Sequence, residues 1–445
     1  MDAENQLRPN PRWWNIVRKI FRAIWLLLLA ILFVVVIRPE WPAFGDPEVQ
    51  IDQQVGLRQF NFPSFWTSAV IKKRGDSLAN QHAWLDEAEQ KQVVLDFVQK
   101  SGEIRQKTIQ LSRVFADPNV ADPDAASAEL QAEIAQLRAE STDLQSLAEP
   151  ILQDQVSTVL SDLGFGVSNT VFPPVAAHVT PLPAVLIISH RNRIQQIKAV
   201  PLTSGILPPE RAILEANIYD DMDLSAYVTN IGGLGIYPSM IIETGNINFL
   251  TEVIAHEWAH HWFSLRPVGL SYLSEPAMRT INESAASLIG KEVGNEVIRR
   301  YYPEFYVPPP EPVEPSENNE NDEPVPIPTP DPNVFDFRRE MGITRVEVDR
   351  LLSAGQIDEA EAYMEERRQI FVAEGYNLRV LNQAYFAFHG AYADVGGGAA
   401  GVDPVGPLVA DVREASGSLK GFMQNLSSVT SLADLQAVAQ ELGVE

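Results

Sequence analysis

The first strongly hydrophobic segment of the chain lies near its N-terminus. From Ala23 to Ile37, fifteen residues follow one another without a charged side chain, and Ile20 and Phe21 extend the run past Arg22. About 18 such residues rise roughly 27 Å as a helix, close to the hydrocarbon thickness of a bilayer. The pattern predicts a transmembrane helix at 23–37. A cleavable signal peptide is the alternative, disfavoured because Ile37–Trp41 offers no pair of small residues for cleavage.

Basic residues are concentrated before this hydrophobic run. In the fifteen residues after it, Arg38 is the one basic residue. The positive-inside rule therefore predicts that residues 1–22 form a cytoplasmic tail. We expect a single-pass protein of the cell membrane, with its N-terminus in the cytoplasm and the rest of the chain extracytoplasmic. The basic residues before the run are Arg8, Arg12, Arg18, Lys19 and Arg22.

Helical periodicity dominates the region 46–163. Apolar residues recur at helical spacing between Ser77 and Leu163, and two proline-containing stretches, Asp117–Asn119 and Asp122–Asp124, interrupt the run. The pattern predicts two long antiparallel helices joined at this break. The hairpin is a spacer or partner-binding stalk, a prodomain-like cover, or a pair of structural helices packed on the rest of the protein. The last interpretation is favoured.

The residue pattern changes in the region 164–306. Runs rich in β-branched residues predict strands at Ala184–Ile188, Ile194–Val200 and Ile236–Ile242. A helix is predicted over Thr251–Leu265, which contains no Pro or Gly and presents a long apolar surface.

The segment 307–333 differs from both neighbours, because its 27 residues include ten Pro and seven Asp or Glu but no Lys or Arg. No core can form from that composition, so we predict a disordered acidic loop. Helical patterning returns in the region 334–445, at Thr344–Glu374, Leu378–Asp394 and Leu432–Leu442. The expected fold class is α+β and predominantly helical.

Composition narrows the possible partners. The 445 residues carry a formal net charge of −25, which would repel a phosphate backbone, so nucleic acid is excluded as a partner. The absence of cysteine removes thiolate ligands, so any zinc must be held by His and carboxylate side chains.

One motif in the predicted helix carries chemistry. His256-Glu257-Trp258-Ala259-His260 places two imidazoles four residues apart, hence on one helical face, where they can bind one zinc ion. Glu257 lies between them, positioned to accept a proton from a metal-bound water. His261 is one residue off this face and is interpreted as a neighbouring or packing residue. A buried helix whose histidines merely form hydrogen bonds is the alternative.

A catalytic zinc usually takes three protein ligands. Asn282-Glu283 lies on a second helical segment, followed by the small residues Ser284–Ala286, and Arg266–Gly269 stops the first helix. Over roughly residues 180–300 the sequence resembles the gluzincin metallopeptidases, the thermolysin-like group, in which an Asn-Glu pair on a second helix supplies the third ligand. The resemblance implies Zn²⁺ as cofactor, Glu283 as third ligand with Asn282 beside it, and a mixed sheet above the cleft.

Two other carboxylates, Glu275 and Glu292, are candidates for the third ligand, but neither has the Asn-Glu context. A solvated or helix-capping role is the alternative for Glu283.

Glycines precede the strand predicted at Ile236–Ile242. Pro238 is tolerated where a ladder position is unpaired, as on a sheet edge, and Gly232–Gly235 would allow a close backbone approach to a ligand. In gluzincins the strand before the zinc helix is such an edge and binds extended peptide. An ordinary buried strand is an equal alternative.

A third set of candidates lies in the C-terminal region. Tyr385, His389 and Tyr392 are spaced four and three apart, hence on one helical face. Gluzincins use a Tyr or His in this part of the catalytic unit to stabilise the oxyanion, and the resemblance implies that role for His389 and Tyr385. A packed aromatic stripe would show the same spacing. This helix is also similar, more distantly, to bacterial families of predicted aminopeptidases.

These features together predict a membrane-anchored zinc peptidase that acts on peptide or protein substrates, with Glu257 as general base. The alternatives are a non-catalytic membrane-anchored scaffold with a zincin-like fold and a hydrolase of non-peptide amides. The intact Glu257 argues against the scaffold, because a site without catalysis needs no base.

Overall fold

A computed structural model of the chain describes residues 11–36, 47–67, 81–116, 120–167, 170–308, 335–376, 378–390 and 405–444. Within these ranges the protein is predominantly helical, with three small sheets, which confirms the predicted α+β class with a helical majority. The chain divides into two compact units, residues 1–53 and 54–445.

The N-terminal unit contains helix α1, Pro11–Val36, and the start of α2, Pro47–Val55. Among the described helices, none combines the length and hydropathy needed to cross a membrane. The transmembrane helix predicted at 23–37 therefore finds no support here. Ile37 lies outside the described residues.

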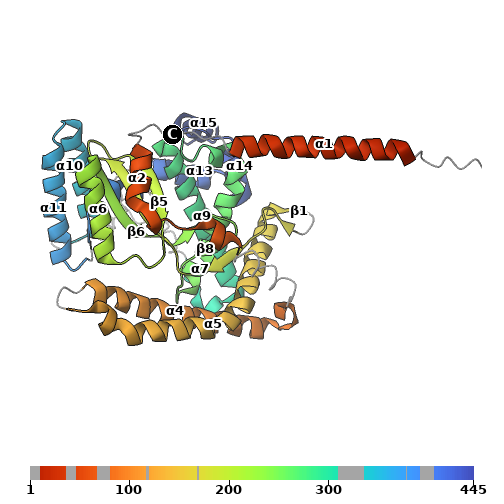
Figure 1. Ribbon diagram of the computed structural model, residues 1–445, viewed down its shortest axis with the longest axis horizontal. Coiled ribbons are helices and arrows are strands. Elements are labelled where there is room, and N and C mark those ends of the chain that lie inside the picture. Colours follow the sequence, from red (N-terminus) through yellow and green to blue (C-terminus); the bar gives the residue numbers. More distant parts are fainter. Residues whose placement is uncertain are drawn as a thin grey trace, which may run out of the picture. The chain divides into compact units, whose positions relative to one another are not determined.

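The predicted helical hairpin is present in the second unit as α4, Glu87–Ala116, and α5, Pro123–Leu160, which lie side by side (Figure 1). Lys100 pairs with Glu140 at 2.8 Å and Lys107 with Glu133 at 2.5 Å. Partner numbers fall along α5 as they rise along α4, so the helices are antiparallel, as predicted.

The hairpin also shares a core with the rest of this unit. Helix α5 packs on α7 and α9 (defined below), and Val156, Val159 and Leu160 are buried in the same cluster as residues of those helices. This supports the interpretation of α4 and α5 as structural helices packed on the rest of the protein rather than as a separate stalk.

The first sheet is antiparallel, in the order β5-β4-β6. Its strands are β4, Ala184–His190, β5, Gln196–Leu202, and β6, Leu224–Asn230; α6, Pro208–Met222, connects the last two. Strand β4 is central and buried from Ala184 to Ser189, which explains its continuous apolar run. Helix α12, Gln383–His389, packs on β4 and β6. The sequence pattern revealed neither α6 nor β6.

The second sheet is mixed, in the order β3-β8-β7, with β3 parallel and β7 antiparallel to β8. Its strands are β3, Ala177–Val179, β7, Gly233–Leu234, and β8, Ser239–Ile241; a separate pair consists of β1, Gly166–Val167, and β2, Thr170–Val171. Of the two interpretations of the strand containing Pro238, the edge was wrong and the ordinary buried strand is confirmed. Strand β8 is the middle strand, and Pro238 precedes its first residue, where no ladder hydrogen bond is required. The edge strand is β7.

Two buried helices form the centre of the unit: α7, Ile247–Ser264, and α9, Pro276–Tyr301, joined through the short α8, Pro267–Leu270. Asn246 caps α7 by accepting a hydrogen bond from the Phe249 N–H at 3.1 Å. The helix ends at Ser264, before the predicted stop at Arg266–Gly269.

Glycines on α9 allow α7 to approach closely. A Cβ added at Gly294 would lie 2.8 Å from the backbone N and Cα of Glu252, and one added at Gly290 would lie 2.8 Å from the Glu252 carbonyl oxygen. The small residues Ser284–Ala286, predicted to permit this approach, are buried. The tightest contacts occur further along α9, at Gly290 and Gly294.

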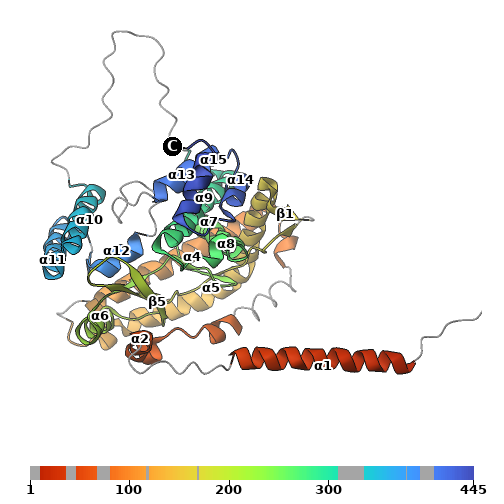
Figure 2. The ribbon, with the colours of Figure 1, turned by 90° about the horizontal axis from the view of Figure 1, so that it is seen from above.

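The C-terminal region is helical, as predicted, in every part that the structure describes. Its helices, besides α12, are α10, Phe337–Ser353, α11, Ile357–Ala373, α13, Val405–Ala415, α14, Leu419–Leu426, and α15, Leu432–Glu441. Helices α10 and α11 pack together, whereas α13 packs on α9 and on α15 (Figure 2). The helix predicted at Leu378–Asp394 is shorter than expected, since Asn382 caps it at the start. All but the first two residues of the predicted acidic loop 307–333 lie outside the described ranges.

Replacing Gly294 with Ala should destabilise the protein by about 1–3 kcal/mol, because the added methyl group meets the α7 backbone and the two helices must separate. Gly342→Ala on α10 is the matched control, since a Cβ there has nothing within 4 Å. It should stabilise by up to about 1 kcal/mol through helix propensity. Urea denaturation of the two purified variants measures both effects, and equal stabilisation by both would contradict the close packing.

Candidate metal centre

The histidines of the motif lie on one face of α7. His256 and His260 are separated by one helical turn, and their Nε2 atoms are 3.1 Å apart. Both side chains are mostly buried, at 15% and 18% exposure. Two imidazole nitrogens at this distance need a proton or a cation between them, because their lone pairs otherwise repel.

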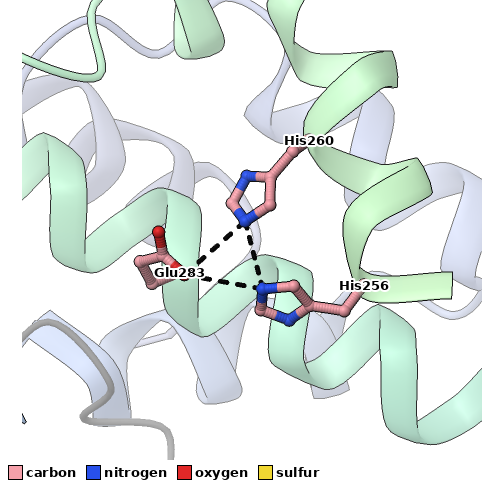
Figure 3. A group of neighbouring side chains, drawn as sticks. All are labelled: His256, His260 and Glu283. Carbon is pink, nitrogen blue, oxygen red and sulfur yellow. Dashed lines mark hydrogen bonds and ion pairs between the residues drawn. The ribbon is translucent and has the colours of Figure 1, made fainter. Parts of the chain in front are cut away.

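Glu283 reaches the same point from α9. Its Oε2 atom lies 3.5 Å from the Nε2 of each histidine, and the three side chains point toward one another (Figure 3). His256, His260 and Glu283 are called the triad below. Their ligand atoms all lie within 4.8 Å of one another, so the group can hold a metal ion.

The spacing of the triad fits a single ion. Nitrogen and oxygen ligands bind zinc at about 2.0–2.2 Å, and tetrahedral angles then place neighbouring ligand atoms about 3.3–3.5 Å apart. The observed separations are 3.1, 3.5 and 3.5 Å. Two imidazoles and one carboxylate are also the donor set of a catalytic site with an open fourth position.

The electrostatics of the triad favour a bound cation. Burial acts to raise the pKa of Glu283, but His260 and His256 outweigh it and hold the pKa of that carboxyl well below its usual range. Burial acts to lower the pKa of His260, and Glu283 and Glu257 reverse that effect and raise it. The carboxylate that stabilises a proton on the imidazoles would equally stabilise a metal ion in its place.

Glu257 lies beside the triad, under the edge strand β7. It is 5% exposed, and burial raises the pKa of its carboxyl. A Cβ added at Gly233 would lie 2.1 Å from its Oε1, and one added at Gly235 would lie 3.1 Å from its Oε2. Gly233 and Gly235 therefore leave room for the Glu257 side chain. In the structure it is this side chain that comes close to their backbone.

His261 and Asn282 position the segments around the triad. The Nε2 of His261 lies 2.9 Å from the Ile236 carbonyl oxygen, so this residue holds the β7–β8 connection, as the prediction of a neighbouring or packing role expected. The side-chain amide of Asn282 donates to the carbonyl oxygens of Val268 at 3.0 Å and Met278 at 2.8 Å. Asn282 thereby fixes α8 against α9.

Tyr272, which the sequence did not single out, contacts the triad directly. It lies between α8 and α9, and its hydroxyl donates to Glu283 Oε1 at 2.5 Å. Burial and the Glu283 charge raise the pKa of this hydroxyl, so it stays protonated and remains a donor. No periodicity or spacing marks Tyr272, because it lies in a turn eleven residues before its partner.

The oxyanion candidates lie elsewhere. Tyr385 is 4% exposed, and its ring lies 5.4 Å from that of Tyr227 and 4.3 Å from that of His389. Burial, with a contribution from Arg279, lowers the pKa of His389 to about 4, so it is neutral near pH 7. Within the described residues, neither side chain contacts the triad, and the packed aromatic interpretation accounts for both. Tyr392 lies outside the described residues.

No protein-family model, curated protein sequence or solved structure matches this chain. The resemblance to gluzincins therefore rests on the motif residues and their spacing.

We predict that Glu283→Ala lowers the bound divalent metal of the purified protein by about tenfold or more, because one of three ligands is lost. Glu292→Ala, on the same helix, should leave the metal content unchanged, since that carboxylate pairs with Arg413 instead. Metal content after dialysis against trace zinc measures both. An unchanged content in Glu283→Ala would place the third ligand elsewhere.

Proposed function

We propose that the protein is a zinc-dependent peptidase. The observation that carries the proposal is the combination of three donors at ligand spacing, two mostly buried imidazoles and one buried carboxylate, with a second buried carboxylate, Glu257, beside them but outside the triad. A structural zinc site needs no such additional base. The absence of cysteine fits this His-and-carboxylate donor set.

Each residue has a separate role in the proposal. His256, His260 and Glu283 hold the zinc, and Tyr272 keeps the Glu283 carboxylate oriented by its hydrogen bond. Zinc bound there supplies Lewis acidity and lowers the pKa of a water molecule. Glu257 accepts the proton of that water and returns it to the leaving amine. Its raised pKa brings it closer to the neutral range, where a carboxylate works best as a reversible base.

The edge strand β7 offers a place for the substrate backbone. It pairs with β8 on one side, and Gly233 and Gly235 lie against the Glu257 carboxylate. An extended peptide added along the other side of β7 would run beside the triad, with its backbone hydrogen-bonded to the strand. The proposal assigns no residue to the oxyanion, since His389 and Tyr385 make no contact with the triad in the described residues.

Glu257→Gln should retain the metal and lose peptide hydrolysis by about 10²–10⁴-fold, because the ligands are untouched while the proton acceptor is gone. Zinc content and the release of peptide products, measured on the same preparation, check the two halves. Glu292→Gln serves as the control for loss of a carboxylate. Full turnover in Glu257→Gln would remove it from the role of base, and loss of zinc would make it a ligand.

Membrane attachment through the N-terminal segment is a further proposal, made from the charge asymmetry around residues 23–37. If it is right, the full chain stays with the membranes after alkaline extraction, and deletion of residues 1–46 releases it. Protease added to intact cells should then cut the acidic segment 307–333. A chain found in the extracted supernatant would argue against the anchor, and protection of that segment until lysis would place the site in the cytoplasm.

A further inference from the structure

A cavity of about 200 Å³ lies next to the triad within the second unit. Its walls come from three parts of the chain: the β4–β5 turn, the segment that leads into α9, and the C-terminal helices α10 and α12. Among the lining residues are Gln196, Tyr272, Arg279, Thr280, Arg345 and Gly390.

Two of these residues connect the cavity to the metal centre. Tyr272 lines the cavity and donates its hydroxyl hydrogen to Glu283 Oε1 at 2.5 Å. Thr280 also lines it and lies three residues before Glu283 on α9, hence on the same side of the helix. A group in the cavity is therefore separated from the triad by a single side chain.

The cavity wall carries guanidinium groups. The Nη1 atom of Arg279 donates to Gln196 Oε1 at 2.6 Å and to the Ala387 carbonyl oxygen at 3.1 Å, and these two contacts help to hold the side chain in place. Burial lowers the pKa of His389 and the Arg279 charge adds to that effect, whereas burial raises the pKa of Tyr272 and the Arg279 charge opposes it.

A second guanidinium, from Arg345 on α10, also lines the cavity, and it pairs with Asp349 at 2.8 Å. Its Nη1 atom would be 3.8 Å from a Cβ at Gly390, so the glycine leaves room beside it. The one carboxylate in the lining, Glu275, accepts a hydrogen bond from the Leu432 N–H at 2.8 Å. The lining therefore contributes two guanidinium groups and one carboxylate, and Asp349, which pairs with Arg345, lies outside it.

We propose that this cavity is a substrate subsite that binds a carboxylate of the peptide through Arg279 and Arg345. This rests on the proposed peptidase function and gives it a substrate class: peptides with a carboxylate close to the cleaved bond. Guanidinium groups bind carboxylates through two parallel hydrogen bonds, which gives geometric selection as well as charge attraction. The carboxylate belongs either to the C-terminus of the peptide or to an Asp or Glu side chain, and the experiment separates these two sources.

The first test compares four peptides on the zinc-loaded full chain. The four peptides share one sequence apart from Glu or Gln at one position and a free or amidated C-terminus. The comparison is then repeated with that position moved along the peptide. We expect kcat/KM to be about tenfold or more higher for one kind of carboxylate, mainly through KM. A preference for the free C-terminus identifies the terminal carboxylate, and a preference for Glu over Gln identifies a side chain.

Variants assign that preference to the cavity. Arg279→Gln and Arg345→Gln should each reduce the preference toward one, mainly by raising KM for the carboxylate-bearing peptide. Arg299→Gln is the matched control, because this exposed arginine of α9 pairs with Glu296 away from the cavity. Arg345→Gln keeps the test valid if Arg279→Gln fails to fold, which thermal melting would reveal.

A binding measurement separates failure of the subsite from failure of the proposed function. Calorimetric titration of the metal-free full chain with Glu-containing and Gln-containing tripeptides, free or amidated, requires no catalysis. We expect the carboxylate form to bind about tenfold more tightly and Arg279→Gln to abolish the difference. Equal binding, or hydrolysis without preference, overturns the subsite and leaves the peptidase standing. Selective binding without hydrolysis of any peptide overturns the peptidase and leaves the subsite standing.

Discussion

The close packing of α7 on α9 is the constraint on which the candidate metal centre depends. The two imidazoles come from α7 and the carboxylate from α9, so the separation of the helices fixes the distance between them. Gly290 and Gly294 remove the side chains that would keep the backbones apart, and a Cβ at Gly290 would lie 3.1 Å from the Cβ of His256 itself. The axes of packed helices ordinarily lie about 8–10 Å apart, at a distance set by the side chains at the contact. The same contact therefore anchors a ligand and buries the core on both sides of it.

Burial and neighbouring charges together determine the pKa values of the two carboxyl groups in this centre. Glu257 and Glu283 are both 5% exposed, and two carboxylates out of water would normally be protonated. The surroundings shift the pKa values of the two carboxyl groups in opposite directions. Glu283 has two imidazoles and the Tyr272 hydroxyl to stabilise its charge, so its pKa falls. Glu257 lies against glycine backbone and its pKa rises. The fold thereby separates a permanent anion, suited to hold a metal, from a carboxyl that can exchange a proton.

The sequence predicts those parts of the protein that local chemistry determines. Helical periodicity gives the α4–α5 hairpin and the terminal helix α15, and β-branched runs give β4 and β5. The motif predicts that His256 and His260 share one helical face, since that follows from their spacing on a single helix, whereas the meeting with Glu283 was implied by the resemblance to gluzincins.

What the sequence does not reveal depends on tertiary contacts. Tyr272 lies in a turn, and Arg279 and Arg345 become neighbours of one cavity although 65 positions separate them in the chain. The edge strand was misplaced for the same reason, because the order of strands in a sheet follows from pairing across the fold and not from the position of one proline. Tyr385 and His389 show the converse: helical spacing puts them on one face, but the face packs on Tyr227.

The parts of the second unit therefore contribute different properties to one site. The helices α7 and α9 supply the donors, the small mixed sheet supplies a backbone edge above Glu257, and α10 and α12 supply walls of the cavity beyond Tyr272. The proposed chemistry depends on a motif five residues long and one distant glutamate. The proposed selectivity depends on a cavity assembled from segments between Ile194 and Gly390. Because the acidic chain as a whole repels anions at long range, the proposed binding of a carboxylate would rely on these short-range guanidinium contacts.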